Sequence, residues 1–258
     1  MFDLCRMISK NRIKYIHSLE QKKYRKQEGV FVAEGPKLVG DLLTVMTCVY
    51  VAGVDEWIND NCRFIPTDCA VDTVTEDELR KVSFLETPQK VLAVFRQPEY
   101  DARISDVAKD NLCIALDDVQ NPGNLGTIVR LADWFGIEHI FCSKGSADIY
   151  NPKTVQATMG GIARVKVHYV HLASELSSAN GVPVYGTFLD GENMYSKTLT
   201  NHGVIIMGNE GRGVSDEVGS LVNERLYIPN YPEGRETSES LNVAIATAIV
   251  CAEFRRRG

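Results

Sequence analysis

Three polar clusters each follow an apolar run that is typical of a strand. The first cluster, Asp117–Gly126, leads into a helical pattern that contains Arg130. The second is the glycine-rich run Gly208–Gly213, and the third surrounds Ser240 and Asn242. In open α/β sheets, ligands bind beyond the carboxyl ends of the strands. The three clusters are therefore candidates for the chemistry of this protein.

The first cluster offers Asn124 and Arg130 as candidate site residues. Successive helical residues turn by about 100°, so these two side chains lie on different faces if both are helical. They converge only if Asn124 lies in the loop or caps the helix. The alternative is that Asn124 is an N-cap and Arg130 an exposed side chain, and the spacing alone favours this alternative.

The second cluster is rich in glycine, which lets a backbone approach a ligand closely or adopt a positive φ. It lacks the Lys-Ser/Thr pair of a nucleotide-triphosphate loop, and Glu210 would repel a phosphate. It also lacks the spacing of a dinucleotide-binding fingerprint. Taken alone, this cluster predicts a tight turn.

The third cluster lies between a short strand, Leu226–Ile228, and a helical run, Leu241–Phe254. This helical run is apolar nearly all round, so we expect it to be covered on two sides, by its own sheet and by a partner subunit. If the helix entry is extended, Ser240 and Asn242 share one side and face a crevice. Ser240 is also compatible with a simple cap of the last helix.

The segments around these clusters predict two α/β domains, residues 1–98 and 99–258. The second shows strand–helix alternation, which indicates a mainly parallel sheet covered on both faces. Its predicted strands cover residues 112–116, 139–142, 182–188, 204–207 and 226–228, and its predicted helices cover residues 125–135, 155–163, 172–177, 216–221 and 241–254. In the first domain, strands are predicted at residues 30–33, 49–52, 63–65 and 91–95.

Charge is distributed unevenly along the chain. Residues 1–98 hold 14 basic and 14 acidic side chains, whereas residues 99–258 hold 14 basic and 20 acidic ones. Eight basic residues crowd the opening: Arg6, Lys10, Arg12, Lys14, Lys22, Lys23, Arg25 and Lys26. Such a patch can attract phosphates even though the net charge is −6. A solvated helix face explains it equally well.

Other features exclude several classes of protein. No apolar run is long enough to span a membrane, and the polar, basic opening is unlike a signal peptide. The seven cysteines are scattered without a C-x-x-C pair, so we expect reduced thiols, no zinc site and a cytoplasmic location. No metal-ligand spacing is present, and we predict no metal.

Together, the three clusters resemble the SpoU/TrmH branch of the SPOUT superfamily, S-adenosylmethionine-dependent RNA ribose 2′-O-methyltransferases. The resemblance rests on three ordered motifs within residues 112–256: Asn124-x-Gly126-x-x-x-Arg130 with Ala132-Asp133 and Phe135-Gly136, then Gly208-x-Glu210-Gly211-x-Gly213, then Ile228-Pro229 with Ser240-Leu241-Asn242-Val243. The run Val30–Gly35, followed by a helix, also resembles the ribosomal-protein-like substrate-binding domain often attached to this branch.

The resemblance implies a parallel-sheet catalytic domain with a C-terminal trefoil knot, preceded by a small α/β domain that binds RNA. It also implies methylation of a ribose 2′-hydroxyl in rRNA or tRNA, by a homodimer that forms through the C-terminal domain and whose two subunits complete one RNA site. The implied reaction centre is Asn124, Arg130, Glu210, Ser240 and Asn242. Contacts to S-adenosylmethionine are implied at Thr187, Gly208, Ile228 and Leu241.

The chain departs from the family pattern in one place. Ten residues, 230–239, separate Pro229 from Ser240. The usual family connection is shorter, by about the number of residues in one helical turn. We expect this stretch to form a mobile rim over the cofactor that becomes ordered when RNA docks. A rigid turn shaped by Pro232 and Gly234 is the alternative.

Two rival functions are open from the sequence. A nucleotide-cofactor dehydrogenase would need the missing glycine fingerprint. A non-catalytic RNA-binding protein that retains the knotted fold would not need Arg130, Glu210 and Asn242 together. None of the five histidines lies in a motif, so no conventional base is present. Because a guanidinium stays protonated at neutral pH, Arg130 either acts as the base in a strongly perturbed site or mainly orients phosphate and hydroxyl.

Overall fold

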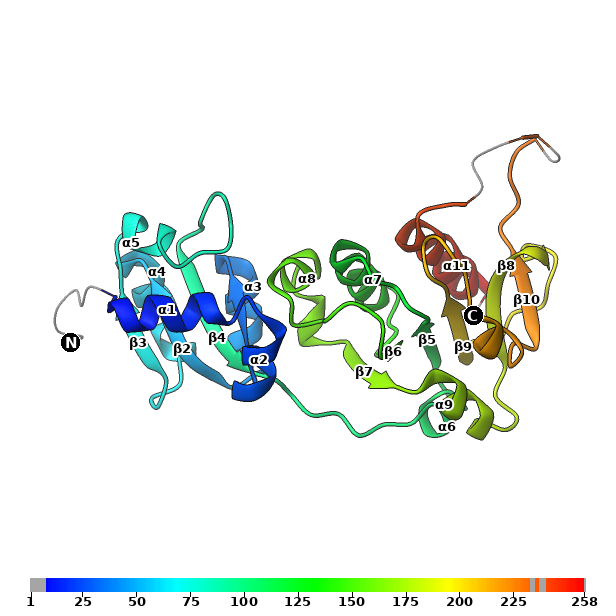
Figure 1. Ribbon diagram of the computed structural model, residues 1–258, viewed down its shortest axis with the longest axis horizontal. Helices are drawn as coiled ribbons and strands as arrows, with labels where there is room; N and C mark the ends of the chain where they lie inside the picture. The colour runs from blue at the N-terminus through cyan, green and yellow to red at the C-terminus, as the bar shows by residue number, and fades with distance from the viewer. Residues whose placement is uncertain (1–7, 233–234, 237–239, 258) are drawn as a thin grey trace. The chain divides into compact units, whose positions relative to one another are not determined.

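The computed structural model describes residues 8–232, 235–236 and 240–257 (Figure 1). Contacts divide the chain into two units, of which the first contains residues up to 99 together with 148–163, and the second contains residues 100–147 together with those from 164 onward. The chain therefore passes between the units three times. The predicted division placed every residue after 98 in the second domain. In the structure, segment 148–163 packs with the first unit, which the sequence did not predict.

A four-stranded sheet in the order β1-β4-β2-β3 forms the centre of the first unit. Strand β4 runs antiparallel to β1 and β2. Strand β3 lies at one edge of the sheet and runs parallel to β2. The strands are β1 (Val30–Glu34), β2 (Cys48–Gly53), β3 (Ala70–Thr73) and β4 (Val91–Arg96). The helices are α1 (Lys10–Ser18), α2 (Lys22–Glu28), α3 (Pro36–Leu43), α4 (Asp55–Asn61), α5 (Glu76–Arg80) and α8 (Pro152–Ala157), with 3₁₀ turns at Cys62–Phe64 and Gly161–Ala163.

Segment 148–163 joins this unit by packing on β1. The ring of Tyr150 lies 5.0 Å from that of Phe31, measured between centroids, and α8 contacts the same strand. The segment buries three apolar side chains, Ile149, Val155 and Ile162. Burial of each such side chain is worth about 1.5–3 kcal/mol, which explains why the segment stays with the first unit.

The second unit is built on a six-stranded sheet in the order β10-β8-β9-β5-β6-β7, in which each pair of neighbouring strands is parallel. The strands are β5 (Leu112–Leu116), β6 (His139–Ser143), β7 (Lys166–Val170), β8 (Val184–Asn193), β9 (Gly203–Met207) and β10 (Glu224–Tyr227). The helices are α6 (Ile104–Val107), α7 (Pro122–Trp134), α9 (Leu172–Ser178), α10 (Asp216–Gly219) and α11 (Val243–Arg257).

Both faces of this sheet are covered, as parallel sheets require. Leu172 of α9 and Val218 of α10 join one core with Val184 of β8. Neighbouring side chains point to opposite faces, so Tyr185 points the other way, where its ring lies 4.9 Å from that of Phe254 in α11. Helix α11 packs along α7, and Figure 1 shows these two helices on the side of the strands opposite to α6 and α9. The predicted parallel-sheet α/β fold is confirmed.

Some predicted elements are wrong or displaced. The strand predicted at residues 63–65 is a 3₁₀ turn, and β3 takes the edge position instead. Phe64 is exposed, and the Arg63 guanidinium lies over its ring, so this residue packs locally and not in the sheet. The edge strand β7 was not predicted, although Val167 and Tyr169 alternate with more polar neighbours in the manner of a strand.

The helix predicted at residues 155–163 is also broken. Helix α8 ends at Ala157, and the next residues include Met159 and Gly160 with φ values of 50° and 95°. Left-handed residues end a right-handed helix, and only the short 3₁₀ turn follows. No helix within the described residues is long and apolar enough to cross a membrane. The trefoil knot stays a prediction, because the strand order does not establish how the chain is threaded.

Candidate active site

The carboxyl ends of β10, β8, β9 and β5 lie side by side, because these strands are parallel neighbours in the sheet. The residues that follow β5, β9 and β10 carry the three polar clusters. A cavity of about 460 Å³ lies at this edge of the sheet. Sites for small molecules typically measure about 300–1,000 Å³, so the cavity has the size of a ligand site.

All four residues predicted to contact the cofactor line this cavity: Thr187, Gly208, Ile228 and Leu241. Two predicted reaction-centre residues, Glu210 and Ser240, line it as well. Apolar side chains form further parts of its wall: Phe188, Leu189, Leu226 and Val243. The sequence prediction missed Phe188 and Leu189, whose signal was their position directly after Thr187.

Thr187 reaches the cavity through a bulge in β8. Gly186 pairs with Arg225 of β10, but the next pair joins Glu192 to Leu226. Residues 187–191 therefore leave the ladder, and this bulge carries Thr187 and its two successors to the cavity wall. The strand predicted at residues 182–188 continues in fact to Asn193.

The loop after β9 folds back tightly on itself. Asn209 and Gly213 exchange two backbone hydrogen bonds of 2.9 Å each, and the Oδ1 atom of Asn209 accepts from the backbone N–H groups of Gly211 and Arg212. A Cβ on Gly208 would lie 2.3 Å from backbone atoms of Gly213 and Val214, which no side chain can tolerate. The predicted tight turn is confirmed, and the same turn forms one wall of the cavity.

Two aspartates after β5 fix this loop to the first cluster. The Oδ2 atom of Asp117 accepts from the backbone N–H of Ser215 at 2.8 Å. The backbone oxygen of Asp118 accepts from Nδ2 of Asn209 at 2.7 Å, and its carboxylate pairs with Arg212. These positioning contacts were not predicted, because they join residues more than ninety positions apart.

The three clusters meet in one chain of hydrogen bonds. The Nδ2 atom of Asn124 donates to Oε1 of Glu210 at 2.8 Å, and the Nδ2 atom of Asn242 donates to Oδ1 of Asn124 at 3.1 Å. Asn124 thus uses its acceptor and one donor to join the other two side chains. Asn121, not Asn124, caps α7, and Asn124 lies in the first turn of that helix, so the N-cap alternative for Asn124 is wrong.

Arg130 lies apart from these three residues. It is exposed and lies six positions after Asn124 on the same helix, which places the two side chains on faces about 120° apart. Within the described residues, its side chain makes no hydrogen bond or ion pair and does not line the cavity. Because both residues are helical, the side chains of Asn124 and Arg130 do not converge within one chain.

The third cluster enters α11 through Asn242. Its Oδ1 atom accepts from the backbone N–H groups of Ala244 and Ile245 at 2.9 and 3.3 Å, so Asn242 caps the helix. The alternative that Ser240 is this cap is wrong. In the preceding loop, Asn230 donates to the backbone oxygen of Arg235 at 2.8 Å. Residues 233–234 and 237–239 lie outside the described part, so the mobile rim stays a prediction.

No group of three or more metal-ligating side chains occurs among the described residues. The histidines of the second unit lie elsewhere on it. His139 and His168 stack on β6 and β7, with an Nδ1–Nε2 distance of 3.0 Å, and His171 and His202 bond to neighbours in the sequence. The cavity therefore offers amide, carboxylate, hydroxyl and backbone groups to a ligand.

Comparison with known proteins places this geometry in a family. A sequence model of the SpoU rRNA methylase family matches residues 111–252, which is more than half of the chain and contains all three clusters. The chain belongs to the SpoU rRNA methylase family. A second model, the MRM3-like substrate binding domain, matches residues 10–93. The predicted resemblance to the SpoU/TrmH branch is thereby confirmed.

Individual relatives agree with this assignment. The chain is 33% identical over 251 residues to the 23S rRNA (guanosine(2553)-2′-O)-methyltransferase RlmP of Bacillus subtilis, covering 95% of this chain and 96% of that protein. The solved structure of a TrmH-family protein from Porphyromonas gingivalis is 42% identical, with a TM-score of 0.87 over 98% of this chain and 100% of that one. An AdoMet-bound rRNA methyltransferase from Sinorhizobium meliloti is 30% identical, with a TM-score of 0.82 over 95% and 94% of the two chains.

The cavity fits the cofactor of this family, S-adenosylmethionine. Its volume suits a molecule of this size, and its apolar wall suits the faces of an adenine ring. The absence of a side chain at Gly208 leaves backbone at the wall, where amide groups can bind polar edges of a ligand. Ile228 and Leu241 line the same cavity.

Proposed function

We propose that this protein transfers the methyl group of S-adenosylmethionine to a ribose 2′-hydroxyl of ribosomal RNA. The observation that carries this proposal is the hydrogen-bonded chain Asn242–Asn124–Glu210, whose Glu210 lines the cavity. It brings the three family motifs together beside a ligand-sized hollow. RlmP of Bacillus subtilis, similar over nearly its whole length, is named for a guanosine of 23S rRNA, so we choose large-subunit rRNA as the substrate.

The residues of the chain divide the work. Bound S-adenosylmethionine supplies a methyl group on a positively charged sulfur. Backbone at Gly208, Ile228 and Leu241, together with Thr187, holds the cofactor in the cavity. Asn124 and Asn242 fix the carboxylate of Glu210, and Ser240 offers a hydroxyl at the rim, so the ribose enters a site whose polar groups are already placed.

The active form is a homodimer joined through α11. One face of this helix is buried within the chain, whereas the other leaves an apolar stripe uncovered or half covered: Ile245, Ala248, Ile249 and Ala252. Ile245 is 54% exposed, and the neighbouring helix α7 ends in Trp134, which is 83% exposed. Such a patch supports contact with a second copy of the chain.

A dimer also gives Arg130 a place in the reaction. Because Arg130 lies on a different face of α7 from Asn124, we assign it to the active site of the partner subunit. There its guanidinium orients the phosphate and the ribose hydroxyl, a task suited to a fixed fork of N–H donors. This assignment retains the predicted role of Arg130 although it does not line the cavity of its own chain.

The first unit, residues 1–99 with segment 148–163, selects the RNA. Its support is the basic opening and the match to a substrate-binding domain over residues 10–93. Deleting residues 1–98 would leave segment 148–163 without the strand on which it packs, so point variants test this role more cleanly.

We place the protein in the cytoplasm, where its six described cysteines stay free thiols.

The deciding experiment is tritiated-methyl transfer from S-adenosylmethionine to ribosomal RNA that lacks modifications. We expect incorporation at one nucleotide of the large-subunit RNA, as a ribose methyl group that resists alkaline cleavage of the adjoining phosphodiester. Isothermal titration should detect S-adenosylmethionine binding and no binding of NADH. RNA binding without any transfer would favour the alternative of a non-catalytic RNA-binding protein.

A further inference from the structure

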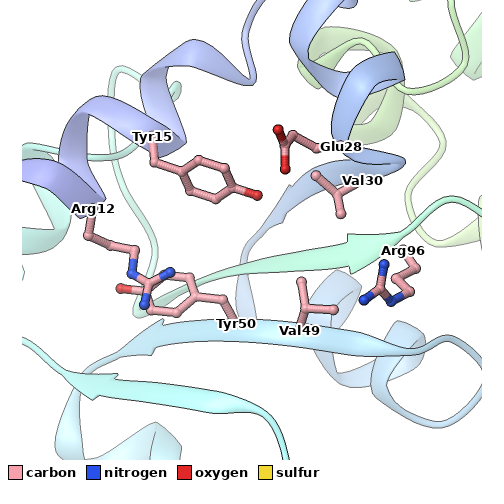
Figure 2. Close-up of a pocket in the computed structure, with 7 residues that line it drawn as sticks. All are labelled: Arg12, Tyr15, Glu28, Val30, Val49, Tyr50 and Arg96. Carbon is pink, nitrogen blue, oxygen red and sulfur yellow. The ribbon is translucent and has the colours of Figure 1, made fainter.

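The first unit contains a second hollow, of about 280 Å³ (Figure 2). It lies between α1, the end of α2 and strands β1, β2 and β4, all within this unit. Figure 2 shows Tyr15 on one side of the open space and Val49 and Tyr50 on the other. Arg12 and Arg96 lie at opposite ends. The hollow is close to the lower limit of ligand sites, about 300 Å³, which suits a single flat ring system.

One wall of the hollow is held rigidly. Tyr50 is 2% exposed, and its hydroxyl donates to Oδ2 of Asp72 at 2.9 Å. The guanidinium carbon of Arg12 lies 4.4 Å from the centroid of the Tyr50 ring, which fixes the arginine by a cation–π contact and leaves its N–H groups unused. The wall therefore presents donors that need no rearrangement to meet a ligand.

Apart from the Tyr50 hydroxyl, the polar side-chain groups around the hollow are unpaired. Within the described residues, the side chains of Arg12, Arg96 and Glu28, and the hydroxyl of Tyr15, make no hydrogen bond or ion pair. Other arginines of the chain do pair with carboxylates, as Arg80 does with Asp77 and Arg225 with Asp190. A carboxylate and two guanidinium groups thus face one space without neutralising one another, which suits a ligand that offers both donors and acceptors.

Burial, followed by the nearby Glu28 carboxylate, raises the pKa of Tyr15 above its ordinary value. The hydroxyl therefore stays protonated at neutral pH and can donate a hydrogen bond, while its ring offers a face for stacking. Stacking on aromatic rings and contacts to the exposed base edges are the usual means by which proteins recognise unpaired nucleotides of RNA.

Among the four bases, guanine matches this set of groups. Its Watson–Crick edge carries two adjacent donors, N1–H and the N2 amino group, which a carboxylate accepts together. Its other edge carries two acceptors, O6 and N7, the usual partners of an arginine. Adenine and cytosine offer one amino group beside a ring acceptor, and uracil offers one N–H between two acceptors, so each would set an acceptor against the carboxylate of Glu28.

We propose that this hollow binds an unpaired guanosine of the RNA substrate. The Glu28 carboxylate accepts from N1 and N2, Arg96 donates to O6 and N7, and Arg12 donates to the adjoining phosphate. The base lies against Tyr15. This inference rests on the proposed function, since it takes RNA as the substrate, and it adds a sequence-selective contact in the first unit. All lining residues except Arg96 fall within the part matched by the substrate-binding model.

The test uses the full-length protein and fluorescein-labelled five-nucleotide RNAs, UUGUU, UUAUU, UUCUU and UUUUU. Wild-type protein should bind UUGUU about tenfold more tightly than the other three, as a good bidentate contact provides. Replacing guanosine by inosine, which lacks the N2 amino group, should weaken binding to the wild-type protein. The Glu28→Gln variant should bind the guanosine and inosine RNAs equally, because the carboxylate that accepts from both N1 and N2 is lost.

Matched controls separate the hollow from general charge. Arg12→Ala should weaken binding of all four RNAs and reduce the slope of log affinity against log salt by about one. Arg63→Ala removes another arginine that lies over an aromatic ring in the same unit, and Glu20→Gln removes another exposed carboxylate near Glu28 in sequence. Both controls should bind as wild type does.

Several results would overturn the inference: equal wild-type affinity for all four RNAs, retained guanine preference in Glu28→Gln, or losses in the controls as large as those in Arg12→Ala. Each variant is also compared with wild type in thermal melting, so that a folding defect is recognised. The Tyr15→Phe variant is a milder change, because it removes the hydroxyl and keeps the ring. Methyl transfer to ribosomal RNA is measured on the same wild-type preparation. Transfer without guanine preference removes only this inference, whereas guanine preference without transfer removes the proposed function.

Discussion

Arg25 and Asp148 form a buried ion pair that joins residues 123 positions apart in the sequence. The Nη2–Oδ2 distance is 2.6 Å, and the Arg25 side chain is only 2% exposed. Its Nη1 atom also donates to the backbone oxygens of Leu19 and Glu20. The pair stands at the start of segment 148–163 and ties it to the first unit.

The Asp148→Asn variant should destabilise the protein by about 3–5 kcal/mol, because removing one partner leaves a buried charge uncompensated. The Nε atom of Arg25 also lacks a partner among the described residues. Without Asp148, the buried guanidinium keeps only its two bonds to the backbone oxygens of Leu19 and Glu20. Urea unfolding measures the change, and amide exchange should increase in α8. In the control Asp77→Asn, the exposed pair with Arg80 is lost and stability should change little. A loss at Asp148 no larger than this control would contradict the prediction.

Arg130→Ala and Glu210→Ala should each abolish methyl transfer, whereas Arg130→Ala should still bind S-adenosylmethionine. If one site uses Arg130 of one subunit and Glu210 of its partner, mixed dimers of the two inactive variants contain one intact site. Random mixing should then restore about a quarter of wild-type activity. Continued inactivity of mixtures whose subunits are shown to exchange would place both residues in the same chain's site.

Asn242 performs two tasks that separate variants can distinguish. Asn242→Asp keeps the oxygen that caps α11 but loses the amide donor to Asn124. We expect nearly normal thermal stability and a large fall in kcat. Asn242→Ala loses both contacts and should also cost about 1 kcal/mol of stability from the missing cap. Normal turnover of Asn242→Asp would show that the bond to Asn124 does not order the reaction centre.

Ile245→Asp should dissociate the proposed dimer, because it puts a charge into the exposed apolar stripe of α11. Sedimentation velocity at micromolar concentration should show a dimer for wild type and a monomer for the variant, with loss of methyl transfer. Val45→Asp, at another exposed apolar residue on the first unit, is the matched control and should stay dimeric. A wild-type monomer with full activity would rule out both the dimer and the shared site.

Acid should weaken the second unit through His168. Burial, and then the neighbouring His139, lowers the pKa of His168 to about 4. Since the unfolded side chain has a pKa near 6.5, the unfolded state binds more protons between these values, so stability falls as the pH drops from about 6.5 to about 4. The loss reaches about 3 kcal/mol for this group.

His168→Gln keeps a hydrogen-bond partner for His139 and removes the titration. Urea unfolding at a series of pH values should therefore give a flatter dependence for the variant in this range. His139, whose pKa is also lowered by burial, accounts for part of the remaining slope. An unchanged slope in the variant would assign the acid sensitivity to other groups.

The sequence was sufficient for features that depend on neighbouring residues. The alternation of apolar runs from Leu112 onward predicted the parallel sheet, and the glycines from Gly208 to Gly213 predicted a tight turn. It was also sufficient for the family, because three motifs in order are specific even when each alone is compatible with an ordinary cap or turn.

Tertiary structure alone decided how distant segments meet. The bond from Asn242 to Asn124 joins residues 118 positions apart, and the bulge that carries Thr187 to the cavity depends on the register of β8 with β10. Likewise, nothing in segment 148–163 distinguishes a helix that packs on its own sheet from one that packs on β1. Local patterns reflect side-chain spacing within a few residues, whereas register and docking depend on complementarity between two surfaces, and only the folded chain brings those surfaces together.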